Sequence, residues 1–555
     1  MNENNALDLT MAYRRLDAAC GRQHDLLRSN RQYERQLFLP AEDNVASADK
    51  AYADLLAQAK ALPAPDAVYS ILRSHLIDFI EAQRSTLQST VEHPASYLAG
   101  LTNYLTFMGR KDSRAAGERV SLLLNRLQQV DGLWDSVSGL LPAAPTNRLQ
   151  DVIDNCATLQ LVSQQCHHQV EQDYQGASDE DLRRTQAALA ELADKAGRWQ
   201  QTVGRLVEAR PAEAAVGSDA PLNMDRERYR MVLDQELGVS LDELLSWYDS
   251  EVDKTRAEMV EIAARVRPAG WPAIATPLAA VELMNTKAGP CDSPAEMFAR
   301  LRQYLDRAQV ACQQFVRLPE EHCRVVPVPE QHRLTYPWGG YGGGCPRRRP
   351  LLGEVFLNDT NYRAVSDGWI KINAVHECYP GHHVQFVRST LDPLPETVKI
   401  GAKRVPLQEG MCHRTERLME FLFEEDPYYP LAVAFRRHHT AVRIKADLYL
   451  MYFNRPEEDA IQLYMDELGF DRKTALGQVK SQEMQNRIGY FTCYYYGMKK
   501  LADMEARYGY DQKTFTEYLF SVLNVSLTNF ERFLQLSEAD KQRFLTGFPS
   551  LLQFS

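Results

Sequence analysis

Apolar residues in the first two hundred positions recur at the spacing of an α-helix rather than that of a β-strand. One stripe follows a start signal at Asp66 and consists of Leu72, Leu76, Phe79 and Ile80. A second stripe follows Ser178 and consists of Leu182, Leu189, Leu192, Trp199, Val203 and Leu206. Steps of three, four and seven residues put each stripe on one helix face. Both stripes therefore predict amphipathic helices that pack against a core.

Two stretches interrupt this helical pattern. Residues 208–223, EARPAEAAVGSDAPLN, have no apolar periodicity and predict a boundary between an N-terminal helical lobe, 1–222, and a catalytic lobe with C-terminal helices, 223–555. Residues 326–363 are rich in Pro and Gly and include a strand-like run at 354–357, which predicts a loop with one or two strands. The glycine-rich run 339–344 in this stretch lacks the setting of a phosphate loop and is interpreted as a mobile flap.

Helical patterning returns from residue 367 to the end of the sequence. One late helix is marked by an apolar face made of Phe515, Tyr518, Leu519 and Val522. The predicted fold is therefore mainly α, with two helical lobes around a deep cleft and a small β element before the helix that starts near Asp367.

Composition narrows the choice of partners. The chain has 555 residues, 45% of them hydrophobic and 25% charged, as expected for a globular protein with a large core. The net charge is −11 and the basic residues are interspersed with acids, so nucleic acid is not an expected partner. No secretory signal and no run of about 20 apolar residues is evident, so we expect a cytoplasmic protein without a membrane partner. Ten cysteines without a CxxC pair predict free thiols.

The stretch most informative for chemistry is 369–388, WIKINAVHECYPGHHVQFVR. The helical spacing of Trp369, Ile372 and His376 predicts that His376 emerges from one side of a helix, with Glu377 beside it. A His-Glu pair on a helix is half of a known zinc signature, in which the His binds Zn²⁺ and the Glu takes a proton from the metal-bound water. His376 is therefore a candidate metal ligand and Glu377 a candidate catalytic base.

The second ligand is left open by the spacing. In the common signature a second His follows four residues after the first, but Pro380 occupies that position and must kink or end the helix. Beyond this break lie His382 and His383. An unbroken helix would favour His383, since seven residues bring it back to the face of His376, but the Pro-Gly break removes that geometry. Both histidines remain candidates.

A third ligand is expected on a following helix, where LQEGMCHRTERLMEFLF offers Glu409 and Glu416 on one face. In zincins with two His and one Glu, the first such Glu binds the metal, and a later acid commonly orients a ligand His. Glu409 is therefore assigned to the metal and Glu416 to the support of a ligand.

Together, H-E-x-x-P-G-H at 376–382 and E-G-x₅-E at 409–416 resemble the bacterial domain-of-unknown-function 885 family, a group of zincin-like helical proteins. The spacing is also similar to that of the gluzincin peptidases. The resemblance spans residues 230–510 and implies a zincin-like fold with Zn²⁺ on His376, His382 and Glu409. It favours His382 over His383 because the family allows either His or an aromatic residue after P-G-H.

Further family elements are kept only in part. Arg443 and Asp447 survive, but Met451 stands where the family has a His, and E-G-W-A-x-Y is replaced by E-G-M-C-H-R. The resemblance implies that Tyr494 stabilises an oxyanion, although it could equally belong to an aromatic core stripe. The residues expected beside the ligands or against the substrate are His383, Glu416, Arg443, Asp447 and Tyr490.

These features predict a zinc-dependent, peptidase-like hydrolase that cleaves an amide or peptide bond in a peptide or a small amide-containing substrate. One alternative is a biosynthetic or tailoring enzyme that uses the same metal on a specialised small molecule, which the altered family motifs would suit. Another is a non-catalytic binding protein on a zincin scaffold. Cys378, Cys412 and Cys493 lie in the three motif segments and are expected to be buried thiols, with a thiol switch or metal ligation as alternatives. The sequence leaves the oligomeric state open.

Overall fold

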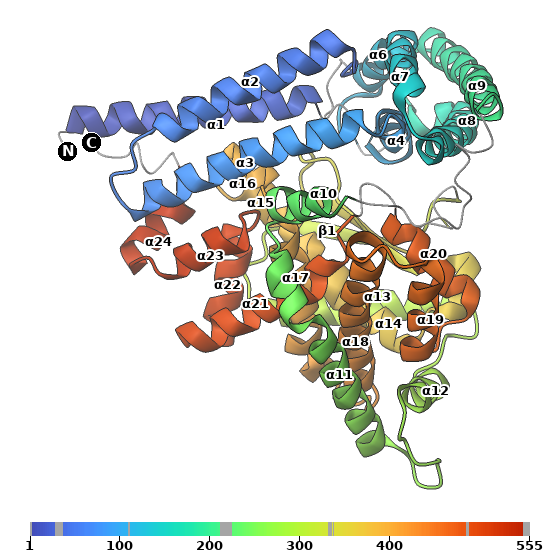
Figure 1. Ribbon diagram of the computed structural model, residues 1–555, viewed down its shortest axis with the longest axis vertical. Coiled ribbons are helices and arrows are strands. Elements are labelled where there is room, and N and C mark those ends of the chain that lie inside the picture. Colours follow the sequence, from blue (N-terminus) through green and yellow to red (C-terminus); the bar gives the residue numbers. More distant parts are fainter. Residues whose placement is uncertain are drawn as a thin grey trace.

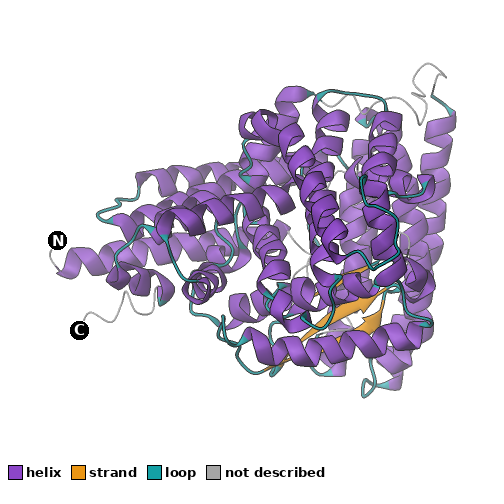
Figure 2. Cartoon of the chain, turned by 90° about the horizontal axis from the view of Figure 1, so that it is seen from below, coloured by secondary structure: helices purple, strands orange, loops and turns teal. Residues whose placement is uncertain are grey.

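A computed structural model describes residues 3–27, 37–108, 112–210, 225–330, 333, 336, 338–483 and 488–547. Helices dominate these residues, which confirms the predicted mainly α fold, and the strands form one small sheet (Figures 1 and 2). Within the described ranges, no helix is both long enough and apolar enough to span a bilayer. All ten cysteines are free thiols, as predicted.

The first three helices are long and run side by side along the upper edge of Figure 1. They are α1 (Glu3–Leu27), α2 (Glu42–Ala61) and α3 (Ala67–Val91). Helix α3 starts where the sequence predicted, because the Asp66 side chain accepts a hydrogen bond from the Tyr69 amide and caps the helix. The apolar stripe predicted after Asp66 is buried, so this prediction is confirmed.

A helical bundle follows at one end of these long helices (Figure 1). It contains α4 (Ala95–Asn103), α6 (Ala116–Leu127), α7 (Val130–Leu140), α8 (Thr146–Asp173) and α9 (Asp179–Glu208). Ser178 caps α9 by accepting from the Asp181 amide. The stripe predicted on α9 is buried at Leu189, Leu192, Trp199 and Val203, but Leu206 is 40% exposed, so its assignment to the core was wrong.

The apolar cores are distributed across the sequence. Most buried apolar side chains of α1–α3 belong to the same core as those of the chain after residue 225, whereas the bundle from α4 to α9 has a core of its own. Most of the predicted boundary segment, 208–223, lies within 211–224, outside the described residues. The division into lobes 1–222 and 223–555 therefore stays a prediction.

The C-terminal half packs its helices below α3 in the view of Figure 1. The helices before the sheet are α10 (Arg226–Met231), α11 (Leu241–Val266), α12 (Pro277–Lys287) and α13 (Pro294–Cys312). Those after it are α14 (Asp367–Asn373), α15 (His382–Leu391), α16 (Glu396–Ile400), α17 (Val405–Leu418), α18 (Tyr429–Asp447), α19 (Glu457–Leu468), α20 (Arg472–Glu483), α21 (Thr492–Tyr508), α22 (Gln512–Val522), α23 (Leu527–Leu534) and α24 (Glu538–Leu545). Helix α22 is the predicted late helix, and its apolar face is buried.

The sheet has three strands in the order β1 (Glu321–Pro327), β3 (Leu351–Leu357), β2 (Gly339–Gly342). Strands β1 and β3 are parallel, and β2 is an antiparallel edge strand. The interpretation of 339–344 as a flap was therefore wrong for Gly339–Gly342. Pairing requires glycine there, because a Cβ on Gly339 would lie 2.3 Å from the Phe356 carbonyl oxygen.

Candidate metal centre

The predicted histidine helix begins and breaks as its sequence dictates. Ser366 caps α14 by accepting from the Trp369 amide. The helix continues as a π-helical turn at Ala374–Cys378, and Tyr379 is extended, with φ −131° and ψ 106°. The break expected from Pro380 is thus confirmed, and it leaves His376 and Glu377 on the last helical turn.

Gly381 allows the chain to fold back on this turn. A Cβ at Gly381 would lie 1.9 Å from the backbone oxygen of His376, a distance that no other residue tolerates. Helix α15 then starts at His382, whose ring centroid is 5.2 Å from that of His376. The Pro-Gly break therefore gives His382 the position that a helical spacing of four gives in the common signature.

Three side chains converge at this point: His376, His382 and Glu409. Their candidate ligand atoms all lie within 4.8 Å of one another. The Glu409 Oε2 atom is 3.5 Å from His376 Nε2 and 3.3 Å from His382 Nε2. It is buried and has no hydrogen-bond partner among the described residues. Burial of an unpartnered carboxylate oxygen is unfavourable unless a cation balances it.

The far nitrogen of each histidine is held by a side-chain acceptor. His376 Nδ1 is 2.8 Å from Glu416 Oε1, and His382 Nδ1 is 2.8 Å from the amide oxygen of Gln385. Each ring therefore directs its Nε2 atom toward Glu409. Partners of this kind fix the tautomer and orientation of metal-binding histidines.

The buried carboxylates of Glu409 and Glu416 both remain ionised. Burial favours the neutral form of Glu409, but the neighbouring His382 and His376 outweigh it and hold the pKa of Glu409 well below its usual value. The pKa of Glu416 is likewise lowered against burial by His413 and His376. His413 contacts the second Glu416 oxygen at 2.9 Å. The sequence reasoning missed His413, although it lies on the same helix face as Glu409 and Glu416.

His383 faces away from this cluster. Its Nε2 atom bonds the Glu321 carboxylate of β1, and its Nδ1 atom is 2.9 Å from the hydroxyl of Tyr341 on β2. The imidazole is fully buried. His383 therefore connects α15 to the sheet. Only His382 joins His376 and Glu409 in the group of side chains that could bind a metal, the metal-competent group.

Two tyrosines cover the other side of Glu409. The Tyr490 hydroxyl donates to Glu409 Oε1, and the Tyr494 hydroxyl donates to that of Tyr490 at 3.3 Å. The Tyr494 ring stacks on His376, with centroids 6.1 Å apart and planes 14° from parallel. Burial raises the pKa of both phenols, so each stays protonated as a hydrogen-bond donor.

Arg443 and Asp447 have different surroundings. The Arg443 guanidinium lies 5.7 Å from the centre of the Tyr494 ring and donates to Gln478 at 2.9 Å. Asp447 accepts from the Tyr229 hydroxyl at 2.5 Å and thereby links α18 to α10. Burial raises the pKa of Asp447 to about 7. Arg443 thus borders the candidate site, and Asp447 joins two helices.

The three motif cysteines are all buried, as expected, but they have separate partners. Cys378 Sγ is 3.6 Å from Cys323 Sγ, Cys412 Sγ is 3.5 Å from His382 Nδ1, and Cys493 donates to the Gly489 carbonyl oxygen. The metal-competent group found among the described residues contains none of them.

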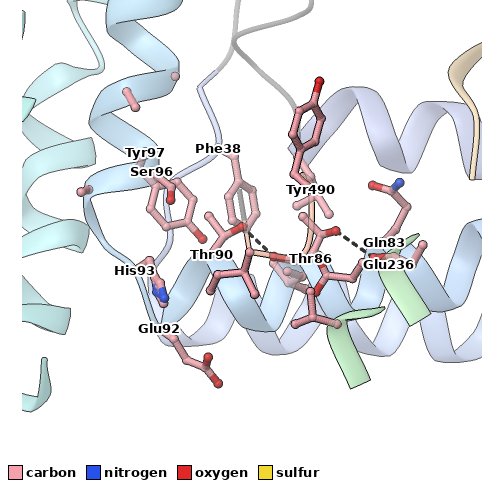
Figure 3. A pocket seen from close by; sticks show the side chains of 18 of the residues that line it. Phe38, Gln83, Thr86, Thr90, Glu92, His93, Ser96, Tyr97, Glu236 and Tyr490 are labelled. Carbon is pink, nitrogen blue, oxygen red and sulfur yellow. Dashed lines mark hydrogen bonds between the residues drawn. The ribbon is translucent and has the colours of Figure 1, made fainter. Parts of the chain in front are cut away.

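A cavity of about 790 Å³ extends to Tyr490, which bonds the candidate ligand Glu409. Residues of α3, α4 and α8, the turn Val232–Leu237, the loop at 400–405, Ile488 and Tyr490 line it. Figure 3 shows Tyr490 in the cavity wall with side chains of α3 such as Gln83 and Thr86. Because Tyr490 also bonds Glu409, one side chain connects the cavity with the candidate metal centre.

Glycine also sets the approach of the helices that carry Glu409 and Tyr494. Helices α17 and α21 touch at Gly410 and Gly497: a Cβ on Gly410 would lie 2.4 Å from the backbone carbon of Gly497. This contact brings Glu409 of α17 within reach of the tyrosines near the start of α21.

We expect Gly410→Ala to lower the free energy of unfolding by about 1 to 3 kcal/mol, as overpacking of a core does. Urea denaturation measures this change. The matched control is Gly477→Ala, also in a helix, where a Cβ meets nothing within 4 Å. It should leave stability unchanged or raise it by up to about 1 kcal/mol. Equal stability of Gly410→Ala and the native chain would contradict the close helix contact.

Comparisons with known proteins agree with this architecture. No curated protein matches the chain significantly. A solved structure of a candidate lipoprotein from Colwellia psychrerythraea is 16% identical, with a TM-score of 0.76 over 97% of this chain and 98% of that one. A candidate lipoprotein of unknown function from Shewanella oneidensis is also 16% identical, with a TM-score of 0.68 over 96% and 98%. Residues 22–519 match the family described as bacterial protein of unknown function (DUF885), and the chain belongs to this family.

Proposed function

We propose that this protein is a zinc-dependent hydrolase that cleaves an amide or peptide bond. The observation that carries the proposal is the convergence of His376, His382 and Glu409 around a buried carboxylate oxygen without a partner. Glu377 follows His376 directly in the same helical turn, where a general base is expected. A purely structural metal site has no need of this base.

The donor set fits zinc. Two imidazole nitrogens and one carboxylate oxygen are the ligands of many catalytic zinc sites, which leave a further position for water or substrate. When bound, zinc lowers the pKa of water to near neutrality and polarises a carbonyl group. Tyr490 holds Glu409 Oε1 and leaves Oε2 for the metal.

The protein's own residues supply the remaining steps. Glu377 accepts a proton from the attacking water and returns it to the leaving nitrogen. Tyr494, protonated and stacked on His376, donates its phenol hydrogen to the oxyanion that forms when water attacks the carbonyl carbon. Glu416 keeps His376 oriented throughout.

The size of the cavity favours a small substrate. Its volume of about 790 Å³ lies in the range of pockets that enclose a single small molecule or a short peptide. Its wall carries charges of both signs, from Arg148, Arg228, Lys403, Arg404, Glu92, Asp151, Asp225 and Glu236. This size also favours a second candidate function, a tailoring enzyme that acts on a specialised small molecule with the same residues.

We propose a cytoplasmic location from the sequence. The two similar structures are described as candidate lipoproteins, but at 16% identity they share the fold alone with this chain. Fractionation of the native cells would decide the location independently of the activity.

The test of the hydrolase proposal measures amine release from a panel of short peptides and small N-acyl amides. The protein is assayed as purified, after removal of metal by a chelator, and after zinc is added back. Cleavage that disappears with the metal and returns with zinc supports the proposal. A folded chain that takes up no zinc would overturn it, and zinc uptake without cleavage of any amide would favour the non-catalytic alternative.

A further inference from the structure

Helix α18 has a buried polar face whose residues have no role in the proposed mechanism. Arg436, His439 and Arg443 follow one another at steps of three and four residues, so they lie on one side of the helix. All three residues are at most 5% exposed. Buried arginines are rare unless a partner compensates the charge.

Arg436 is compensated only in part within the described part of the chain, by a long ion pair with Glu416. Its Nε atom is buried and makes no hydrogen bond. The nearest carboxylate oxygen, Glu416 Oε1, is 3.7 Å away, which is beyond hydrogen-bond distance. Both Glu416 oxygens are already held by His376 and His413. A guanidinium offers five donors and stays charged at any physiological pH, so its burial here is costly without an acceptor.

The surroundings of Arg436 are aromatic. Its guanidinium carbon lies 5.0 Å from the centre of the Trp369 ring and 5.2 Å from that of Tyr494. These cation–π contacts stabilise the charge in part, but ring faces do not accept the N–H groups as a carboxylate does. His439 adds no further positive charge, because burial and the two arginines lower its pKa and keep it neutral.

Tyr494 places this positive charge beside the candidate metal centre. The guanidiniums of Arg436 and Arg443 lie 5.2 Å and 5.7 Å from its ring centre. The same ring stacks on His376. An acyl compound whose carbonyl accepts from the Tyr494 hydroxyl would therefore lie next to a ring that both guanidiniums contact.

We infer that Arg436, with Arg443 beside it, binds a carboxylate of the substrate close to the scissile amide. The guanidinium fork matches a carboxylate in a planar, two-bond arrangement, which would also satisfy the buried Nε–H group of Arg436. This inference rests on the proposed hydrolase function. The substrate class is then an N-acylated amino acid, or a short peptide that is cleaved at its carboxyl-terminal residue.

The test compares the binding of N-acetylalanine and of its uncharged amide, N-acetylalaninamide, by titration calorimetry. The zinc-loaded native protein should bind the acid about ten- to a hundredfold more tightly, as expected for hydrogen bonds between charged groups. Arg436→Gln should lose most of this preference, and Arg436→Lys should keep part of it. Arg437→Gln is the matched control, since Arg437 pairs with Glu258 at 3.1 Å and should leave the preference unchanged.

Zinc content is measured in every variant, so that a carboxylate bound by zinc is distinguished from one bound by Arg436. An equal preference in Arg436→Gln with unchanged zinc would overturn the inference, as would no preference in the native protein. If the native chain binds no zinc but still prefers the acid, the anion site stands and the hydrolase proposal fails. If Arg436→Gln does not fold, the comparison of the native protein with Arg436→Lys decides.

Discussion

Replacing Glu377 by Gln is expected to reduce amide hydrolysis by about 10²- to 10⁴-fold while leaving the fold and the bound metal intact. Gln has nearly the same size but cannot accept the proton of the attacking water. The side chain is half-buried at the end of the π-helical turn and is not part of the metal-competent group. Turnover numbers and zinc content of the native protein and the variant measure the effect.

A second variant and a stability measurement serve as controls for this prediction. Glu377→Asp keeps the carboxylate but withdraws it by one methylene group, so it should retain more activity than Glu377→Gln. Thermal unfolding of all three proteins reveals any loss of structure. If Glu377→Gln retained every measurable function, Glu377 would not be the base, and a binding protein on this scaffold would become the better explanation.

Local sequence signals predicted where helices begin. They did not predict features that depend on the surrounding structure. Asp66 and Ser178 cap α3 and α9 as predicted, because a cap depends on a few neighbouring residues. Leu206 follows the apolar period of α9 but lies near the end of the helix and is exposed. The strand Gly339–Gly342 carries no strand signal of its own, since its pairing with β3 and the lack of a Cβ determine its structure.

Local sequence signals also could not predict which distant helices share a hydrophobic core. Helices α1–α3 are separated from α22–α24 by hundreds of residues, yet they share one core. Contacts of this kind connect Asp78 of α3 with Asn529 of α23, whose side-chain amide donates to it at 3.0 Å. No apolar period along a single segment indicates its partner in space.

The candidate site was predictable as far as its ligands belong to short motifs. His376, Glu409 and Glu416 could be assigned from the spacing of two motifs and from the roles that such residues take in zincins. Tyr490 was expected near the ligands from the family resemblance, but Arg436 was not predicted, because its position depends on how α18 packs against the motif helices. Periodicity left the choice between His382 and His383 open and the family resemblance favoured His382; the backbone turn at Gly381, which periodicity does not describe, explains why His382 faces Glu409.

Removal of His382 is expected to abolish stoichiometric zinc binding, whereas removal of its neighbour His383 is not. Loss of a group that merely orients a ligand costs about 10- to 100-fold in metal affinity, so loss of the His382 ligand should cost more than this. His383 is matched in type and position, but it bonds Glu321 and Tyr341 instead of facing Glu409.

The measurement is a competition titration of zinc against a chelator with His382→Ala, His383→Ala and the native protein. His383→Ala should melt at a lower temperature, since it leaves the buried Glu321 carboxylate without its imidazole partner, but should bind zinc with near-native affinity. The opposite pattern, with zinc retained in His382→Ala and lost in a folded His383→Ala, would show that the metal does not bind between His376 and Glu409. Loss of zinc in both variants would mean that the position of His382 depends on the contact between His383 and the sheet.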